Sequence, residues 1–151
     1  MKRLSVPFPK DAARVTDGPS REGVETWTVG DLPIVVRIST DIDDSSRPDL
    51  RVTLVHGGYQ RQYESETPYG TLQSTNRVDV PGADDAQLSR FRFGRDPSVA
   101  LVLTAGIDSD PTAHTIQVVF PAGMESEYGP IASELLSGAS LVDASNDEVG
   151  Q

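Results

Sequence analysis

Three closely spaced apolar segments between residues 87 and 120 constrain the fold more than any other part of the sequence. They are Gln87–Phe93, Val99–Gly106 and Thr115–Phe120, and short loops join them. Short runs rich in β-branched and aromatic residues, separated by turn residues, are typical of antiparallel strands. Val99–Thr104 is apolar at nearly every position, which predicts a strand inside the sheet with both faces covered.

Further segments upstream also have the composition of strands. These are Val24–Gly30, Ile34–Ser39, Leu50–His56, with Val52 and Leu54 inward, and Thr71–Val80. Gly57-Gly58 predicts a turn or bulge after the third of them. Tyr59–Glu66 is open to three interpretations: a polar strand, the start of a loop, or a helical turn, because Tyr59 and Tyr63 lie four residues apart.

Met124–Gly138 carries the one clear helical pattern, with apolar residues at helical spacing and a glycine at its end. Either Ser126 caps this helix or Pro130 is its first residue. The sequence thus predicts an α+β fold with a central antiparallel sheet of about six to seven strands, helices packed on its faces and a C-terminal helix. The alternative is an all-β sandwich with one helix, which buries only one face of each strand.

We expect one domain over residues 1–142, with an extended N-terminal arm at 1–20 and an acidic, disordered tail at 143–151. Alternation along the central strands selects the predicted core, which consists of Phe91, Phe93, Leu101, Leu103, Val118 and Phe120. The same alternation turns Arg90 and Arg92 toward water.

The chain has 151 residues, a net charge of −10 and no cysteine. This charge argues against nucleic acid and anionic membranes as partners, and the absence of cysteine excludes disulfides and thiolate chemistry. We find no targeting segment and no stretch long enough to cross a membrane, so we expect a cytoplasmic protein, or a secreted or cell-envelope protein if a signal peptide has been removed.

Motifs for catalysis and metal binding are incomplete. His56 and His114 are predicted to lie on the surface at strand edges, and no G-x-S-x-G elbow accompanies them. Asp41-Ile42-Asp43-Asp44 begins like a calcium loop, but Ser46 and Val52 occupy the positions that need glycine and glutamate. We therefore assign no catalytic residue, metal ligand or cofactor.

Tyrosine and arginine are enriched in the energetically important parts of protein interfaces. The residues of these types that we predict to form a contact surface are Tyr59, Arg61, Tyr63, Tyr69, Arg90 and Arg92. The alternative is charge balance on a solvated sheet face.

Residues 78–86, with the sequence V-D-V-P-G-A-D-D-A, are followed by Arg90-Phe91-Arg92-Phe93. This segment resembles the PsbP-like superfamily, in particular its small actinobacterial envelope proteins. Pro7-Phe8-Pro9 near the start, the turn around Gly30–Pro33 and the closing helix are similar as well. The resemblance implies an antiparallel sheet between helices. It implies binding or assembly roles with no common catalytic set, so no functional residue is carried over.

Three functional hypotheses follow. The first is a non-catalytic protein-binding or assembly domain, monomeric or homodimeric, that uses a sheet face or the tyrosine-rich segment. The second is a carrier of a small apolar ligand between sheet and helix. The third is a hydrolase whose residues follow no familiar motif.

Overall fold

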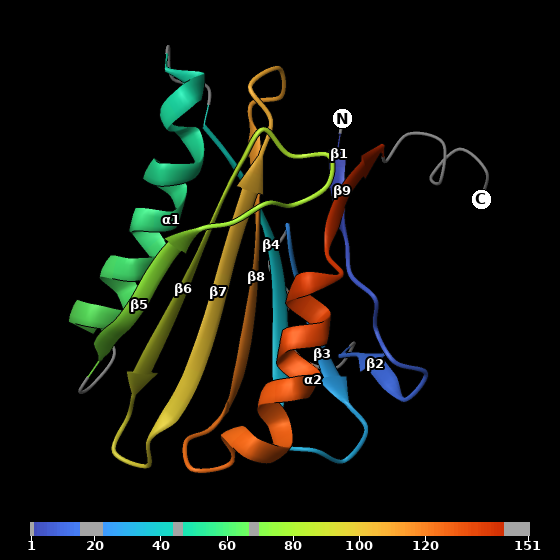
Figure 1. Ribbon diagram of the computed structural model, residues 1–151, viewed down its shortest axis with the longest axis vertical. Coiled ribbons are helices and arrows are strands. Elements are labelled where there is room, and N and C mark those ends of the chain that lie inside the picture. The colour runs from blue at the N-terminus through green and yellow to red at the C-terminus, as the bar shows by residue number, and fades with distance from the viewer. Residues whose placement is uncertain (1, 16–22, 44–46, 67–69, 144–151) are drawn as a thin grey trace.

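A seven-stranded antiparallel sheet forms the centre of the computed structural model, which describes residues 2–15, 23–43, 47–66 and 70–143 (Figure 1). Its strands are β2 (Ala12–Arg14), β3 (Val24–Val29), β4 (Val35–Ile42), β5 (Thr71–Arg77), β6 (Asp85–Phe93), β7 (Ser98–Gly106) and β8 (Thr112–Pro121). They are ordered β2-β3-β4-β8-β7-β6-β5. Strands β6, β7 and β8 contain the three apolar segments between residues 87 and 120.

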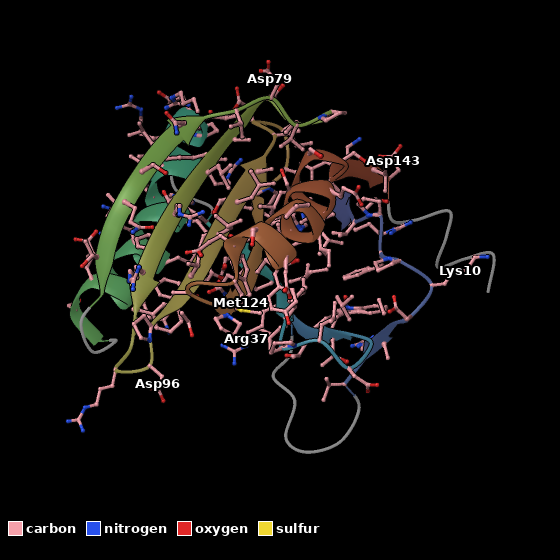
Figure 2. The ribbon with its side chains drawn as sticks, turned by 60° about the horizontal axis from the view of Figure 1, so that its bottom comes forward. Lys10, Arg37, Asp79, Asp96, Met124 and Asp143 are labelled. Atoms are coloured by element: carbon pink, nitrogen blue, oxygen red, sulfur yellow. The ribbon has the colours of Figure 1, made fainter. Side chains whose placement is uncertain are left out.

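One helix covers part of each face of this sheet (Figure 1). Helix α1 (Arg51–Arg61) follows a short 3-10 turn (Pro48–Leu50) and continues into one π-helical turn (Gln62–Glu66); α2 (Glu125–Ser137) lies near the C-terminus. Figure 2 shows α2 in front of the sheet and α1 behind β5 and β6. The predicted α+β class is confirmed, and the sandwich is not observed. Within the described residues, neither helix is long and apolar enough to cross a membrane.

The N-terminal segment is tied to the C-terminal part of the described chain. Strand β1 (Lys2–Ser5) pairs with β9 (Ser140–Asp143) in a second, two-stranded sheet, and Phe8 stacks on Trp27 with ring centroids 4.3 Å apart. Residues 2–15, which fall within the expected arm 1–20, therefore pair with or pack against other described segments. Asp143, the first residue of the expected tail 143–151, belongs to β9, and residues 144–151 lie outside the described residues.

The turn that carries the family resemblance contacts β9. The backbone amide of Leu141 donates to the carbonyl of Pro81 at 2.9 Å. Gly82 has a φ of +85°, and a Cβ there would lie 2.2 Å from the carbonyl oxygen of Leu141. Only glycine fits this conformation and this close approach. The fold therefore explains why the motif has glycine at position 82.

The predicted strand Leu50–His56 and the predicted turn at Gly57-Gly58 are wrong, because Leu50 ends the 3-10 turn and residues 51–58 belong to α1. The buried side of the helix carries Val52, His56 and, in the next turn, Tyr63, whereas Leu54 is 51% exposed. Valine and threonine suit strands, but packing against the sheet overrides this weak local preference. The start of α2 also differs from both predictions: the helix begins at Glu125, so Pro130 lies inside it.

The six predicted core residues are divided between the two faces. Phe91 and Phe93 pack beneath α1, in a cluster that also contains Tyr63. Leu101, Leu103, Val118 and Phe120 belong to the larger cluster beneath α2. Phe93 and Leu101 are half-buried and the other four are buried. Of the two arginines predicted to face water, Arg92 is exposed and Arg90 is half-buried.

A buried arginine fixes the start of α1. Arg51 is only 5% exposed. Its guanidinium donates to the backbone carbonyls of Asp43, Ile107 and Asp110 at 2.6–2.8 Å, and to that of Asp108 at 3.4 Å. These carbonyls belong to the end of β4 and to the β7–β8 loop, so one side chain ties three segments together. Removal of this side chain leaves buried acceptors without donors.

We expect Arg51→Met to lower the free energy of unfolding by about 3 kcal/mol, because methionine fills similar space but donates no hydrogen bond. Arg61→Met is the matched control, since Arg61 lies at the exposed end of the same helix, and we expect a change within about 0.5 kcal/mol. Urea denaturation followed by circular dichroism measures both. Equal losses for the two variants would contradict the proposed role of Arg51.

Candidate functional site

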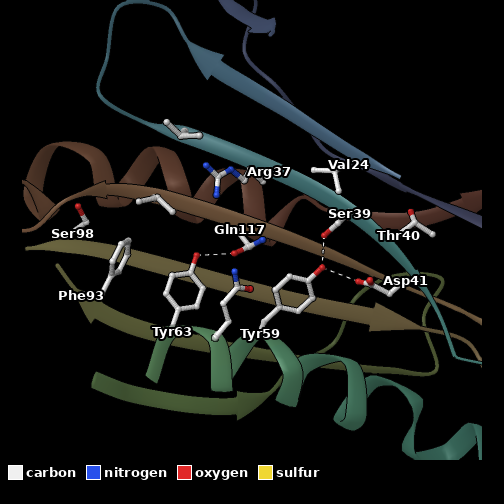
Figure 3. A pocket seen from close by; sticks show the side chains of 13 residues that line it. Val24, Arg37, Ser39, Thr40, Asp41, Tyr59, Tyr63, Phe93, Ser98 and Gln117 are labelled. Carbon is white, nitrogen blue, oxygen red and sulfur yellow. Dashed lines mark hydrogen bonds between the residues drawn. The ribbon is translucent and has the colours of Figure 1, made fainter. Parts of the chain in front are cut away.

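A groove of about 460 Å³ runs between α1 and the part of the sheet that this helix leaves uncovered (Figure 3). We call it the α1 groove. Helix α1 and the π turn form one wall, and β4 and β8 form the floor. The residues that line it are Val24, Val35, Arg37, Ser39, Thr40, Asp41, Tyr59, Gln62, Tyr63, Phe93, Ser98, Gln117 and Val119.

Two charged side chains lie on the floor of the α1 groove. Arg37 and Asp41 belong to β4, and because side chains alternate along a strand they share its groove-facing side, about 13 Å apart. Arg37 is exposed and forms no ion pair within the described part of the chain. Figure 2 labels Arg37, and Figure 3 shows its guanidinium beside Gln117 and Tyr63. Among the described residues, no carboxylate forms an ion pair that balances the charge of this arginine.

Two tyrosines join the helical wall to the floor (Figure 3). The hydroxyl of Tyr63 donates to Oε1 of Gln117 at 2.7 Å, and that of Tyr59 donates to Oδ2 of Asp41 at 2.8 Å. Ser39 Oγ lies 2.6 Å from the same Tyr59 oxygen. Burial raises the pKa of both phenols to about 12, although Arg37 opposes the rise at Tyr63. Both hydroxyls therefore stay protonated and act as hydrogen-bond donors near neutral pH.

Both histidines are buried, so the prediction that they lie on the surface is wrong. His56 is 1% and His114 3% exposed. In α1, His56 Nδ1 lies 2.8 Å from Thr104 Oγ1 and Nε2 lies 2.7 Å from Ser89 Oγ. His114 contacts the hydroxyls of Thr40 and Thr112 in the same way, at 3.0 and 3.2 Å. Hydroxyl partners satisfy ring nitrogens that burial would otherwise leave unpaired.

The pair formed by Ser89 and His56 has the spacing of a nucleophile and its base, but not their surroundings. Ser89 is 0% exposed, so a substrate has no access to its hydroxyl. The third partner is Thr104, not a carboxylate that would stabilise an imidazolium. Burial lowers the pKa of His56 to about 4. Ser89, His56 and Thr104 thus form a buried hydrogen-bond network that positions α1.

A second depression, of about 410 Å³, adjoins the α1 groove, and the two share Asp41, Tyr59 and Gln62. Its other lining residues include Ile42, 77% exposed, and Leu54, 51% exposed. These are the two most exposed large apolar side chains of the described residues. The groove therefore extends from a cationic end at Arg37 to an apolar end at Ile42 and Leu54.

The structure brings together only part of the predicted contact surface. Tyr59 and Tyr63 line the α1 groove, but both are engaged in hydrogen bonds, and Tyr63 is 7% exposed. Arg61 is exposed on α1. Tyr69 lies outside the described residues.

Arg90 and Arg92 lie on the opposite face of the sheet, because Phe91 between them points toward α1. Arg90 contacts Glu125 of α2 at 3.6 Å and donates to Gln73 Oε1 at 2.9 Å. The five of these residues that the structure describes thus form no single surface.

Sequence reasoning missed Arg37, Gln117 and Ile42. The pattern contained a usable signal at Arg37, a charged residue within the otherwise apolar run Ile34–Ile38. Arg37 becomes a site residue only because α1 lies beside β4. The sequence-based prediction placed a strand at residues 50–56 and therefore no helix at this position. Over the described ranges, no three His, Asp or Glu side chains come together in an arrangement that would hold a metal ion.

We expect acid to destabilise the protein through its histidines. The pKa of His56 is about 4 in the folded protein and near 6.5 in the unfolded chain. The unfolded chain therefore binds the proton first, and stability falls as the pH decreases from about 6.5 to about 4, by at most about 3 kcal/mol. His114, whose pKa burial also lowers, adds in the same direction.

Urea denaturation of wild type and His56→Gln at pH 7 and pH 4.5 tests this expectation. Glutamine retains hydrogen-bonding groups but does not titrate, so the variant should lose less stability on acidification than wild type does. Identical pH profiles for the two proteins would show that His56 does not control this dependence.

No protein-family model matches the sequence, and no curated protein matches it either. Solved structures do match. Cyanobacterial PsbP from Synechocystis has a TM-score of 0.66 at 12% identity, with 93% of this chain and 92% of that chain covered. LpqN of Mycobacterium tuberculosis, which is involved in cell envelope biogenesis, has a TM-score of 0.60 at 11% identity, with 95% and 85% covered.

The Saccharomyces cerevisiae Ran-binding protein Mog1p has a TM-score of 0.63 at 10% identity, with 94% of this chain and 92% of that chain covered. At such low identities the likeness concerns the fold alone. It agrees with the resemblance first drawn from residues 78–86. The protein therefore has the PsbP/Mog1-like fold.

Proposed function

We propose that this protein is a non-catalytic binding domain that holds a protein partner in the α1 groove. The observation that carries the proposal is the composition of this surface. Arg37, which has no ion pair among the described residues, lines the α1 groove, and two strongly exposed apolar side chains, Ile42 and Leu54, line the depression that adjoins it. Exposed apolar groups next to directional polar groups are characteristic of interaction sites.

The absence of an accessible catalytic constellation in the described residues supports binding over hydrolysis. Ser89 and His56 are both buried, so a substrate has no access to them. The two groove tyrosines remain protonated because burial raises the pKa of both to about 12. Among the proteins of similar fold, Mog1p is a Ran-binding protein. Fold likeness alone does not transfer a function, so the groove itself carries the argument.

Affinity purification of the tagged protein from its native cells tests this proposal. We expect a stoichiometric partner with wild type and at least tenfold less of it with the double variant Ile42→Asp/Leu54→Asp, because a carboxylate at each position opposes apolar contact. Val15→Asp is the matched control, since Val15 is a large apolar residue, 43% exposed, that does not line the groove. A wild-type protein recovered only as a monomer without a partner would contradict the proposal.

A second candidate function is the transport of a small apolar ligand. A depression of about 450 Å³ lies on the opposite face between α2 and the sheet. Most of its lining is apolar, with Val78, Val80, Leu88, Leu101, Leu103 and Leu136 contributing. It has the size of small-molecule sites, although it is open rather than enclosed.

Native mass spectrometry of the freshly purified protein tests the carrier function. A ligand in this depression would appear as a co-purified mass in wild type and disappear in Leu88→Arg, which places a charged side chain in the apolar lining. A protein without any bound mass would exclude this candidate.

A further inference from the structure

We propose that the occupant of the α1 groove is an amphipathic helix of a protein partner, with a carboxylate opposite Arg37 and a close backbone contact at Gly58. This inference rests on the proposed binding function and specifies the chemistry of the partner. Four features of the described residues carry it: an unbalanced charge, fully paired floor strands, a bare strip of sheet, and a helical glycine.

The first feature is the charge of Arg37. It is the one cation among the residues that line the groove. The one anion there, Asp41, already accepts a hydrogen bond from Tyr59. A guanidinium presents parallel N–H groups that match a carboxylate in two-point geometry. The group that completes this site is therefore an aspartate or glutamate side chain of the partner.

The second feature is the backbone pairing of the floor. Strand β4 is hydrogen-bonded to β3 on one side and to β8 on the other, and β8 is also paired with β7. An extended segment therefore finds no free strand edge in the groove with which to pair. A helix satisfies its own backbone groups and needs only side-chain contacts. The groove favours a helix over an added strand for this reason.

The third feature is the width of the uncovered sheet. Adjacent strands are about 4.8 Å apart, and a helix with its side chains is about 10 Å wide. Helix α1 packs over β6, β7 and β8 and reaches β4 with the Tyr59 hydroxyl, so among the described residues no helix packs over most of β4 and β3 on this face. Two strands give the width that one further helix occupies. A partner helix placed there would lie alongside α1.

The fourth feature is Gly58, which lies in α1 and lines the depression that adjoins the α1 groove. A Cβ at this position would meet nothing within 4 Å, so the fold itself does not require glycine there. Glycine is a poor helix former. On the helix surface Gly58 lies between Leu54 and Gln62, each four residues away, and forms a gap in the wall. Small residues at such positions let two helices approach closely.

Photo-crosslinking in the native cells tests the nature of the occupant. p-Benzoylphenylalanine replaces Gln62 at the groove or, as a control, Thr53 on the exposed side of the same helix. We expect irradiation to link only the Gln62 probe to a partner, and mass spectrometry to identify a linked segment whose sequence has the spacing of an amphipathic helix with an acidic residue on its apolar side. In the same cells Arg37→Glu should reduce the crosslink at least tenfold, whereas Arg92→Glu, a charge reversal on the other sheet face, should not.

The two neighbouring glycines provide a second test that separates binding from folding. Gly57→Ala and Gly58→Ala should both raise the melting temperature, because alanine favours the helix and neither Cβ meets a clash. We expect only Gly58→Ala to weaken binding of the crosslinked partner segment, made as a synthetic peptide, by at least tenfold in isothermal titration calorimetry. Equal affinities for the two variants would overturn the close contact at Gly58.

The outcomes distinguish this inference from the function on which it rests. A crosslink from Gln62 to an extended or basic segment, to a second copy of this chain or to a molecule that is not protein overturns the acidic helix. A crosslink that is unaffected by Arg37→Glu does the same, and both leave the groove as a binding site. No crosslink from Gln62, together with unchanged partner recovery for Ile42→Asp/Leu54→Asp, overturns the binding function as well.

Discussion

The position of α1 on the sheet is the feature on which the rest of this structure depends. Polar side chains help to fix it: Arg51 donates to backbone carbonyls at the end of β4 and in the β7–β8 loop, and His56 bonds to hydroxyls of β6 and β7. Buried hydrogen bonds are directional, so they specify one register of the helix where apolar contact alone would permit several. With that register set, Tyr59 and Tyr63 close one side of the α1 groove.

The groove itself results from a mismatch between sheet and helix. Seven strands span about 29 Å between the outer axes, whereas one helix covers about 10 Å. A single helix on each face therefore leaves a strip of sheet uncovered on each side. The two strips carry different kinds of side chain. The strip beside α1 carries Arg37, whereas the strip beside α2 carries leucines such as Leu88 and Leu101. The same architecture thus presents two distinct surfaces.

Much of the sheet could be predicted because its strands follow local rules. Val99–Thr104 is apolar at nearly every position and proved to be part of an interior strand, and the 78–86 motif indicated the correct fold. Residues 50–61 could not be assigned in this way, because Val52 and Thr53 favour strands and two glycines interrupt the helical pattern. The remaining signal was the spacing of Val52, His56, Tyr59 and Tyr63, which matches one face of a helix but contains few apolar residues.

The sequence by itself determined the approximate number of strands, the C-terminal helix and the exclusion of cysteine chemistry, since these follow from periodicity and composition. Only the tertiary structure decided which side chains share a surface. Arg90 and Arg92 were grouped with the tyrosines because both kinds of residue favour interfaces. The pleat nevertheless places the two arginines on the face of the sheet opposite to Tyr59 and Tyr63. Arg37 became a candidate site residue only once α1 had been placed beside β4, because a groove is formed by segments distant in sequence.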